Sequence, residues 1–265
     1  MAVILHTVFK RMNLNPQQLT QRDKLVLAGL YLSKFDADGL RRLGFDSFVE
    51  AFNVLGYALG GRPARIKNYR DEFDPLFPNA RKGWHKRPRR DYCMRLFDGC
   101  AGLGLEEFGA LIQTFVGLNP KLMPEDGGEG VGDYSPSVFT SRFVTGVAAE
   151  NYFRDMQPRL PEFSDYRLED TTLLGCGYDF CLHPKRGNDF LAVEVKGLKD
   201  ERGNLSLTAR EHHAAETLAD RFILFVVKNF RELPFHEIYQ APLVGPLRFK
   251  RKQQVIVQIN WQATV

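Results

Sequence analysis

A stretch rich in glycine, proline and acidic residues, 120–136 (PKLMPEDGGEGVGDYSP), divides the chain into two parts with different hydrophobic periods. Such residues favour turns and have little to bury, so we expect a linker at 120–136. Apolar residues before it recur at helical spacing, whereas short runs typical of strands follow it. With 265 residues the chain is long enough for two cores. The sequence therefore predicts two domains, 1–119 and 137–265.

The first part has the pattern of a helical domain. Thr20 is a candidate N-cap before a leucine-rich helix. Gly60 and Gly61 end a later helix, and Pro63 suits the first turn of the next one. Helix, glycine break and basic helix form the outline of a helix-turn-helix-like DNA reader. The expected helices span 20–34, 45–59, 64–73, 90–97 and 105–116.

Positive charge is concentrated between Gly61 and Arg95. This segment has eleven Lys or Arg residues and four Asp or Glu residues, a formal charge of +7, while the whole chain carries +4. A local basic segment favours a polyanionic partner, although a solvated helix face would give the same count. Trp84 adds one aromatic ring to a stretch suited to phosphate contact. We expect double-stranded DNA to contact Arg62, Arg65, Lys67, Arg70, Arg81, Lys82, Trp84, Lys86, Arg87, Arg89 and Arg90.

The second part changes to an order of strands and helices. Helices are expected over 139–156 and 208–218, and strands over 177–182, 190–197, 222–228 and 254–259. Thr208 and Glu211 are spaced for a capping box, and we expect His212 and His213 on the helix surface. Strand, strand, helix, strand is an α/β order. The expected fold class is α+β or α/β, a helical DNA-binding domain followed by a mixed-sheet domain.

Three charged residues on two successive strands carry the strongest chemical signal: Asp179 in GYDF, and Glu194 and Lys196 in FLAVEVKG. Residues two apart in a strand share a face, so Glu194 and Lys196 project together, opposite their apolar neighbours. The turn-like segment 183–188 would pair the two strands and bring Asp179 close to Glu194. Charges beside a buried sheet are costly unless paired or bound to a metal. A lone EVK triplet, by contrast, is common on an exposed edge strand with a cross-strand ion pair.

Two carboxylates beside a lysine suit phosphodiester hydrolysis. Carboxylates can hold Mg²⁺, which keeps open positions for water and phosphate oxygens. A bound metal polarises the phosphate and lowers the pKa of a bound water. Lys196 could orient that water or offset charge on the pentavalent transition state.

The order D…ExK on a hairpin, followed by a helix and a strand, resembles the PD-(D/E)XK nuclease superfamily. More narrowly, GYDF, AVEVKG and LSLTAREHHAAETLADRFILFVV resemble the NO VEIN C-terminal domain family, which is similar to Mrr-like restriction endonuclease domains. The resemblance covers roughly 144–230. Tyr178 stands where the superfamily has proline before the first acid.

This resemblance implies a set of functional residues. Lys196 would be the catalytic lysine, and Glu150 an additional acid on the preceding helix, where an exposed helix glutamate would give the same pattern. Mg²⁺ would be the cofactor, with Mn²⁺ able to substitute. The metal ligands would be Asp179, Glu194 and Val195.

These patterns favour a metal-dependent, site-specific, restriction-type endonuclease acting on double-stranded DNA. One D…ExK set cuts one strand, so double-strand cleavage at a symmetric site calls for a homodimer on DNA. Two other functions stay open: a non-catalytic DNA-binding subunit of a defence complex with a nuclease-like fold, and a nuclease acting on RNA or structured DNA. The sequence has no GxxxxGK[ST] phosphate loop, which argues against an ATP-driven motor in this chain.

The cysteines and the apolar runs suggest a compartment. Cys93, Cys100, Cys176 and Cys181 form no CxxC pair and have no His-rich spacing beside them, which argues against zinc and against a disulfide framework. No apolar run approaches the ~18 residues that span a membrane, and the N-terminus has no cleavage-site pattern. We expect a reduced, cytoplasmic protein without a membrane partner.

Overall fold

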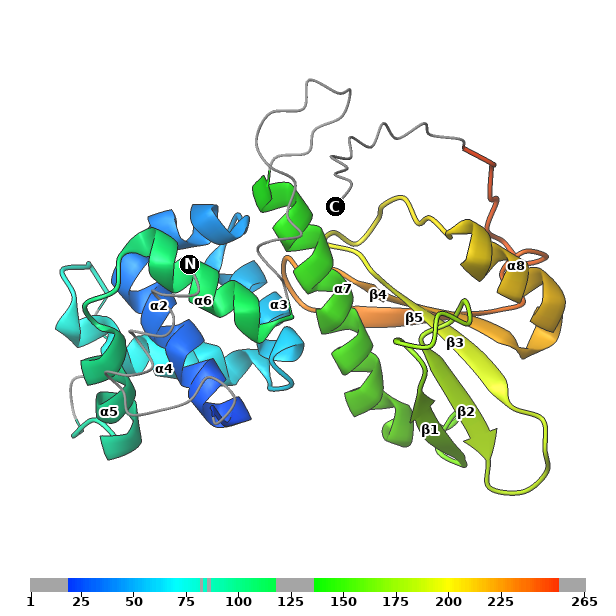
Figure 1. The fold of residues 1–265 in the computed structure, drawn as a ribbon, viewed down its shortest axis with the longest axis horizontal. Helices are drawn as coiled ribbons and strands as arrows, with labels where there is room; N and C mark the ends of the chain where they lie inside the picture. Colours follow the sequence, from blue (N-terminus) through cyan, green and yellow to red (C-terminus); the bar gives the residue numbers. More distant parts are fainter. Residues whose placement is uncertain (1–18, 82, 85–86, 118–135, 253–265) are drawn as a thin grey trace, which may run out of the picture.

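The computed structural model describes residues 19–81, 83–84, 87–117 and 136–252, which form a helical part and a mixed sheet on either side of one long helix (Figure 1). That helix is α7 (Pro136–Met156). The helical part contains α2 (Gln21–Leu43), α3 (Phe48–Ala58), α4 (Pro63–Phe73), α5 (Asp91–Cys100) and α6 (Leu105–Phe115). The sheet part contains β1 (Tyr166–Asp170), β2 (Phe180–Pro184), β3 (Leu191–Gly197), α8 (Ala209–Leu218), β4 (Phe222–Lys228) and β5 (Phe235–Gln240).

Capping side chains define where the helices begin. Thr20 closes a capping box with Asp23 at the start of α2, and the Ser47 hydroxyl accepts a hydrogen bond from the Glu50 N–H at the start of α3. A kink at Asp36, where φ is +51°, interrupts α2, and the helix then continues to Leu43. The expected end near residue 34 was therefore too early, because the break changes the direction of the helix without ending it.

The strands lie in sequence order, β1-β2-β3-β4-β5. Among the described strand pairs only β3–β4 is parallel, and α8 makes the crossover between these two strands. As in any strand, alternate residues face opposite sides of the sheet. Val193 and Phe225 belong to the large core that includes α7, whereas Ala192 and Phe222 pack with Ala214 and Ala215 of α8.

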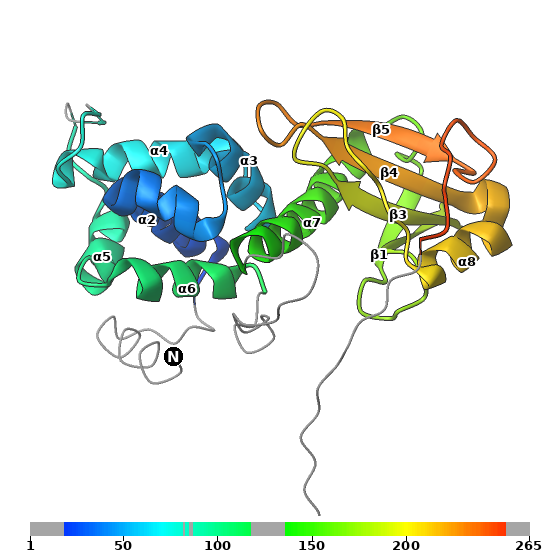
Figure 2. The ribbon, with the colours of Figure 1, turned by 90° about the horizontal axis from the view of Figure 1, so that it is seen from above.

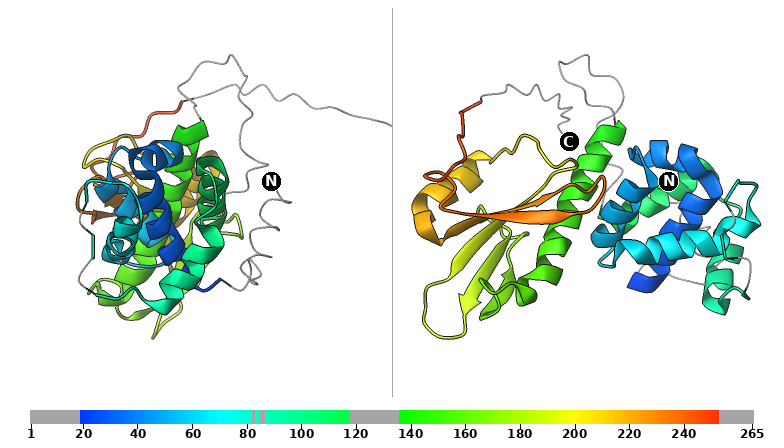
Figure 3. Two further views of the ribbon diagram at one scale, coloured as in Figure 1. Left: turned by 90° about the vertical axis from the view of Figure 1, so that its left-hand side faces the viewer. Right: turned by 180° about the vertical axis from the view of Figure 1, so that it is seen from behind.

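The two parts are packed directly against each other through α3 and α7. Figure 2 and the right-hand view of Figure 3 show α7 between the helical part and the sheet. Asn151 of α7 donates hydrogen bonds to the Tyr57 and Ala58 carbonyls at 3.0 and 3.1 Å. Asn53 of α3 donates to the Phe230 carbonyl, which follows β4, at 2.8 Å. One hydrophobic core runs through both parts.

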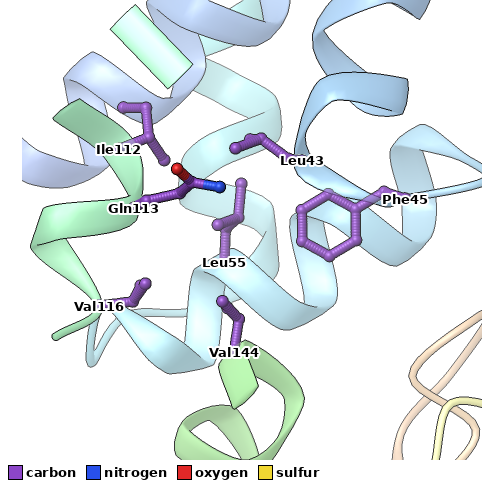
Figure 4. A pocket seen from close by; sticks show the side chains of 7 residues that line it. All are labelled: Leu43, Phe45, Leu55, Ile112, Gln113, Val116 and Val144. Atoms are coloured by element: carbon purple, nitrogen blue, oxygen red, sulfur yellow. The ribbon is translucent and has the colours of Figure 1, made fainter. Parts of the chain in front are cut away.

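A small pocket lies in this packing, where α2, α3 and α6 meet α7 (Figure 4). Its lining is apolar apart from the Gln113 side chain: Leu43, Phe45, Leu55, Ile112, Gln113, Val116 and Val144. None of the D…ExK residues lines it. The pocket is therefore a feature of helix packing.

In the described part of the chain, the sequence predicted the five α-helices that lie before residue 117, and the helices and strands over 139–156, 190–197, 208–218 and 222–228. The strand expected over 177–182 is Phe180–Pro184, so His183 belongs to a strand and not to the turn. The sequence pattern missed β1 and β5. The expected strand 254–259, and the linker 120–136 apart from Pro136, lie outside the described residues. No helix in the described part of the chain is long and apolar enough to cross a membrane.

Candidate functional site

Asp179 stands immediately before the first residue of β2, alongside β3. The register pairs Phe180 with Val193, so Asp179 lies beside Glu194. The Asp179 N–H donates to the Val193 carbonyl at 3.0 Å, and Asp179 Oδ2 accepts a hydrogen bond from the Val195 N–H at 2.8 Å. The antiparallel hairpin expected from the sequence is present, and it positions the Asp179 carboxylate against the backbone of the ExK strand.

Glu194 and Lys196 share the face of β3 that is covered by α8. Lys196 Nζ donates to Glu194 Oε1 at 2.6 Å and to Glu211 Oε2 of α8 at 2.8 Å. Glu194 is only 3% exposed. Glu211 also completes the expected capping box with Thr208. The capping box was predicted from the sequence, but the contact between Glu211 and Lys196 was not. That contact depends on how the crossover places α8 against β3, which the local sequence does not determine.

Glu150 approaches the same end of the sheet from α7. A Cβ on Gly197 would lie 2.8 Å from the Thr145 carbonyl, so glycine at this position lets α7 pack closely on the end of β3. Arg154, one turn after Glu150, places Nη2 3.8 Å from Glu150 Oε2 and 2.6 Å from Asp170 Oδ2. The Glu150 side chain is 26% exposed, so it is not a free surface glutamate. The pair Arg154–Asp170 was not predicted.

This group has an excess of carboxylates: Lys196 is the cation among Glu150, Asp179, Glu194 and Glu211. Burial, reinforced by the Asp179 charge, raises the pKa of Glu194 to about 8 and that of Glu150 to about 7. Burial also raises the pKa of Asp179. Burial lowers the pKa of Lys196, but Glu194 and Glu211 outweigh it, so that pKa is raised and Lys196 stays charged. Near neutral pH the group therefore favours binding of a proton or a cation.

The donor atoms present fit a hard divalent cation. Asp179 and Glu194 offer carboxylate oxygens. The Val195 side chain packs in the α7 core, so this residue can contribute only its backbone carbonyl. In a strand the N–H and C=O of one residue point to the same edge, and the Val195 N–H points at Asp179. Oxygen ligands of this kind suit Mg²⁺ or Mn²⁺, which would offset the excess negative charge.

The excess carboxylate charge leads to a pH prediction. In the presence of a metal chelator, the free energy of unfolding should fall as pH rises from 4.5, the ordinary glutamate pKa, to about 8. Over this range the folded state keeps a proton on Glu194 that the unfolded chain has already released. The loss should be roughly 2–4 kcal/mol. Urea unfolding at several pH values measures it. Glu194→Gln, which cannot ionise, should remove the share of the slope that comes from Glu194 and leave the share that comes from Glu150, whose pKa is raised to about 7. An equal slope in both proteins would contradict the assignment.

The basic residues expected to contact DNA fall into two groups. Arg62, Arg65 and Lys67 are exposed along α4 and form no ion pair with any residue in the described part of the chain. The half-exposed Arg87 guanidinium lies 3.9 Å from the Trp84 ring centroid, and its Nη2 is 3.8 Å from Glu72 Oε2, a long ion pair. Lys82 and Lys86 lie outside the described residues.

Three other arginines are held by acids of the protein itself. Arg81 Nε and Arg70 Nε lie 2.9 and 3.7 Å from the same buried carboxylate oxygen of Asp74. Arg90 Nε donates to buried Glu72 at 2.8 Å. Arg89 is partly buried. Contact of the three paired arginines with phosphate would compete with these ion pairs, so the structure favours a packing role for them.

The surface position expected for the two histidines of α8 is confirmed. The His212 and His213 side chains are 43% and 81% exposed. All four cysteines are free thiols.

In the comparison with known families, the model described as "Protein NO VEIN, C-terminal" matches residues 149–240. That range begins one residue before Glu150 and ends with β5. It therefore contains the whole acid group, by which we mean Glu150, Asp179, Glu194, Lys196 and Glu211. It covers about a third of the chain. Comparisons with curated proteins and with solved structures gave no match.

Proposed function

We propose that the protein is a metal-dependent, restriction-type DNA endonuclease with a PD-(D/E)XK site. The observation that carries the proposal is the partly buried group on β3, where the Asp179 and Glu194 carboxylates lie beside an ion-paired Lys196. The likeness of residues 149–240 to a family linked to nuclease-like domains supports it.

Each residue of the group has a proposed role. Asp179, Glu194 and the Val195 carbonyl would hold a divalent cation, which when bound activates water and polarises the scissile phosphate. Lys196, kept charged by two carboxylates, orients the attacking water and offsets charge on the phosphate. Glu150, with its pKa raised to about 7, can hold or release a proton near neutral pH and is the candidate proton acceptor.

DNA would bind along the exposed side of α4, here called the basic face, which has Arg62 at its N-cap and Arg65 and Lys67 on its two flanks. The packing of α3 against both α4 and α7 connects this face to the sheet. A homodimer on DNA would supply a second acid group for the second strand.

The basic face gives a prediction for DNA binding. The triple variant Arg62→Gln/Arg65→Gln/Lys67→Gln should weaken DNA binding and flatten its salt dependence, since each lost phosphate contact removes roughly 0.9 from the log–log slope. A control triple variant at Arg41, Arg186 and Arg248, which are exposed cations outside α4, should keep the parental slope. Fluorescence anisotropy in Ca²⁺ across a salt series measures both. An unchanged slope in the α4 variant would remove this face from the DNA contact.

Incubation of the purified protein with supercoiled plasmid tests the proposed activity. We expect cleavage in Mg²⁺ or Mn²⁺ and none in EDTA, with discrete fragments from a site-specific enzyme. Single-stranded DNA and RNA of the same length serve as competing substrates. Binding of DNA without cleavage in either metal, on plasmids of varied sequence and modification, would instead support a non-catalytic DNA-binding subunit.

A further inference from the structure

A second group of metal-ligating side chains lies on the β1–β2 hairpin: Glu169, Cys181 and His183. Glu169 faces Cys181 across the antiparallel pair, and His183 is two residues further along β2, so the three share one face. One donor atom from each lies within 4.8 Å of the other two. Cys181 is buried, while the His183 and Glu169 side chains are 36% and 47% exposed.

This group differs in chemistry from the acid group. It combines a thiol, an imidazole and a carboxylate, the donor set that zinc prefers, whereas the acid group offers oxygens alone. Asp179 is two residues before Cys181, but its carboxylate is held by the Val195 N–H. Neither CxxC nor His-rich spacing reveals this group, so the expectation of no zinc did not take it into account. Cys181 and His183 are a ligand pair at the strand period, and a residue of the neighbouring strand completes it.

The surroundings suit an ion at the surface. His183 Nε2 and Glu169 Oε2 are 2.5 Å apart, and binding to a common ion would open this contact by roughly 1 Å, because zinc ligands lie ~2.0–2.3 Å from the metal. The Phe190 ring lies beside His183, with the two ring centroids 6.4 Å apart. The exposure of Glu169 and His183 leaves a path for entry and a fourth position for water.

We propose that Glu169, Cys181 and His183 bind a zinc ion that links β1 to β2. The ion would link the edge strand β1 to β2, the strand that follows Asp179. It would thereby stabilise the β2–β3 hairpin, which carries Asp179 and Glu194. The inference does not depend on nuclease activity, because it rests on different side chains.

Cobalt(II) titration of the metal-stripped full-length protein tests the proposal, since Co²⁺ reports thiolate ligation and tetrahedral geometry by its absorption. We expect a thiolate-to-cobalt band in the near ultraviolet and intense visible bands, both displaced by one equivalent of Zn²⁺. Cys181→Ser should lose the thiolate band. His183→Asn should weaken Co²⁺ binding by more than about tenfold, since loss of even an outer-shell partner commonly costs ~10–100-fold.

Two controls separate this site from other thiols and from the acid group. Cys93→Ser removes a buried thiol of α5 and should leave the spectrum unchanged. Glu194→Gln, which alters the acid group, should also leave it unchanged. Circular dichroism of each variant confirms that it is folded. A wild-type protein without the thiolate band, or a folded Cys181→Ser protein that keeps it, would overturn the proposal.

Discussion

Asp179→Asn and Glu194→Gln should each lower the rate of Mg²⁺-dependent DNA cleavage by roughly 10³-fold or more, because loss of one charged ligand removes several kcal/mol of transition-state stabilisation. Both substitutions keep the shape of the side chain. The amide oxygen that Asp179→Asn introduces can still accept the Val195 N–H, and the one that Glu194→Gln introduces can still accept Lys196. The fold should therefore be retained in both variants.

Cleavage rates of plasmid DNA in Mg²⁺, with DNA binding measured in Ca²⁺, separate chemistry from affinity. Glu201→Gln is a matched control, since Glu201 is an exposed acid in the loop after β3. It should cut DNA at the parental rate. If Asp179→Asn or Glu194→Gln cut at a rate near that of the parent, the carboxylate replaced in that variant would not be a ligand of the catalytic metal.

Lys196→Met should slow the chemical step by about 10²–10⁴-fold, as expected for a positioned charge that acts on the reacting phosphate and water. A single-turnover measurement with DNA bound before Mg²⁺ is added isolates this step. Metal binding should persist, because the acids are unchanged.

Lys199→Met provides the control for the ion pairs themselves. Like Lys196, Lys199 is bound to two carboxylates, Asp46 and Glu50, each at 2.9 Å, but it lies outside the acid group. Its replacement should lower stability and leave the single-turnover rate unchanged. Equal losses of stability with unchanged single-turnover rates in both variants would make Lys196 a structural ion-pair residue.

The central hairpin was predictable because two of its constraints are local. Strand alternation places Glu194 and Lys196 on one face, independently of the rest of the fold. The short turn after β2 makes β3 the nearest strand with which β2 can pair. The strong hydrophobic run of β4 likewise needed only its own residues, because six of its seven positions are buried.

The edges of the sheet were not predictable in this way. The residues of β1, YRLED, have no buried position, and β5 is half-buried on both faces, so neither has the apolar alternation that marks a strand. Asp170 on β1 and its partner Arg154 were missed with them. Glu211 was predicted as a capping residue, but its contact with Lys196 depends on how α8 crosses from β3 to β4. The group of Glu169, Cys181 and His183 was missed because Glu169 lies on β1, a strand that the sequence did not predict.

Direct measurement of Mn²⁺ binding tests the central claim, that the acid group is a metal site. Electron paramagnetic resonance of free Mn²⁺ during titration counts the ions bound by the folded protein. We predict that the wild-type protein binds Mn²⁺, that Asp179→Asn and Glu194→Gln lose this binding, and that Cys181→Ser keeps it. Mn²⁺ bound equally by the wild-type protein and by folded Asp179→Asn would contradict the account.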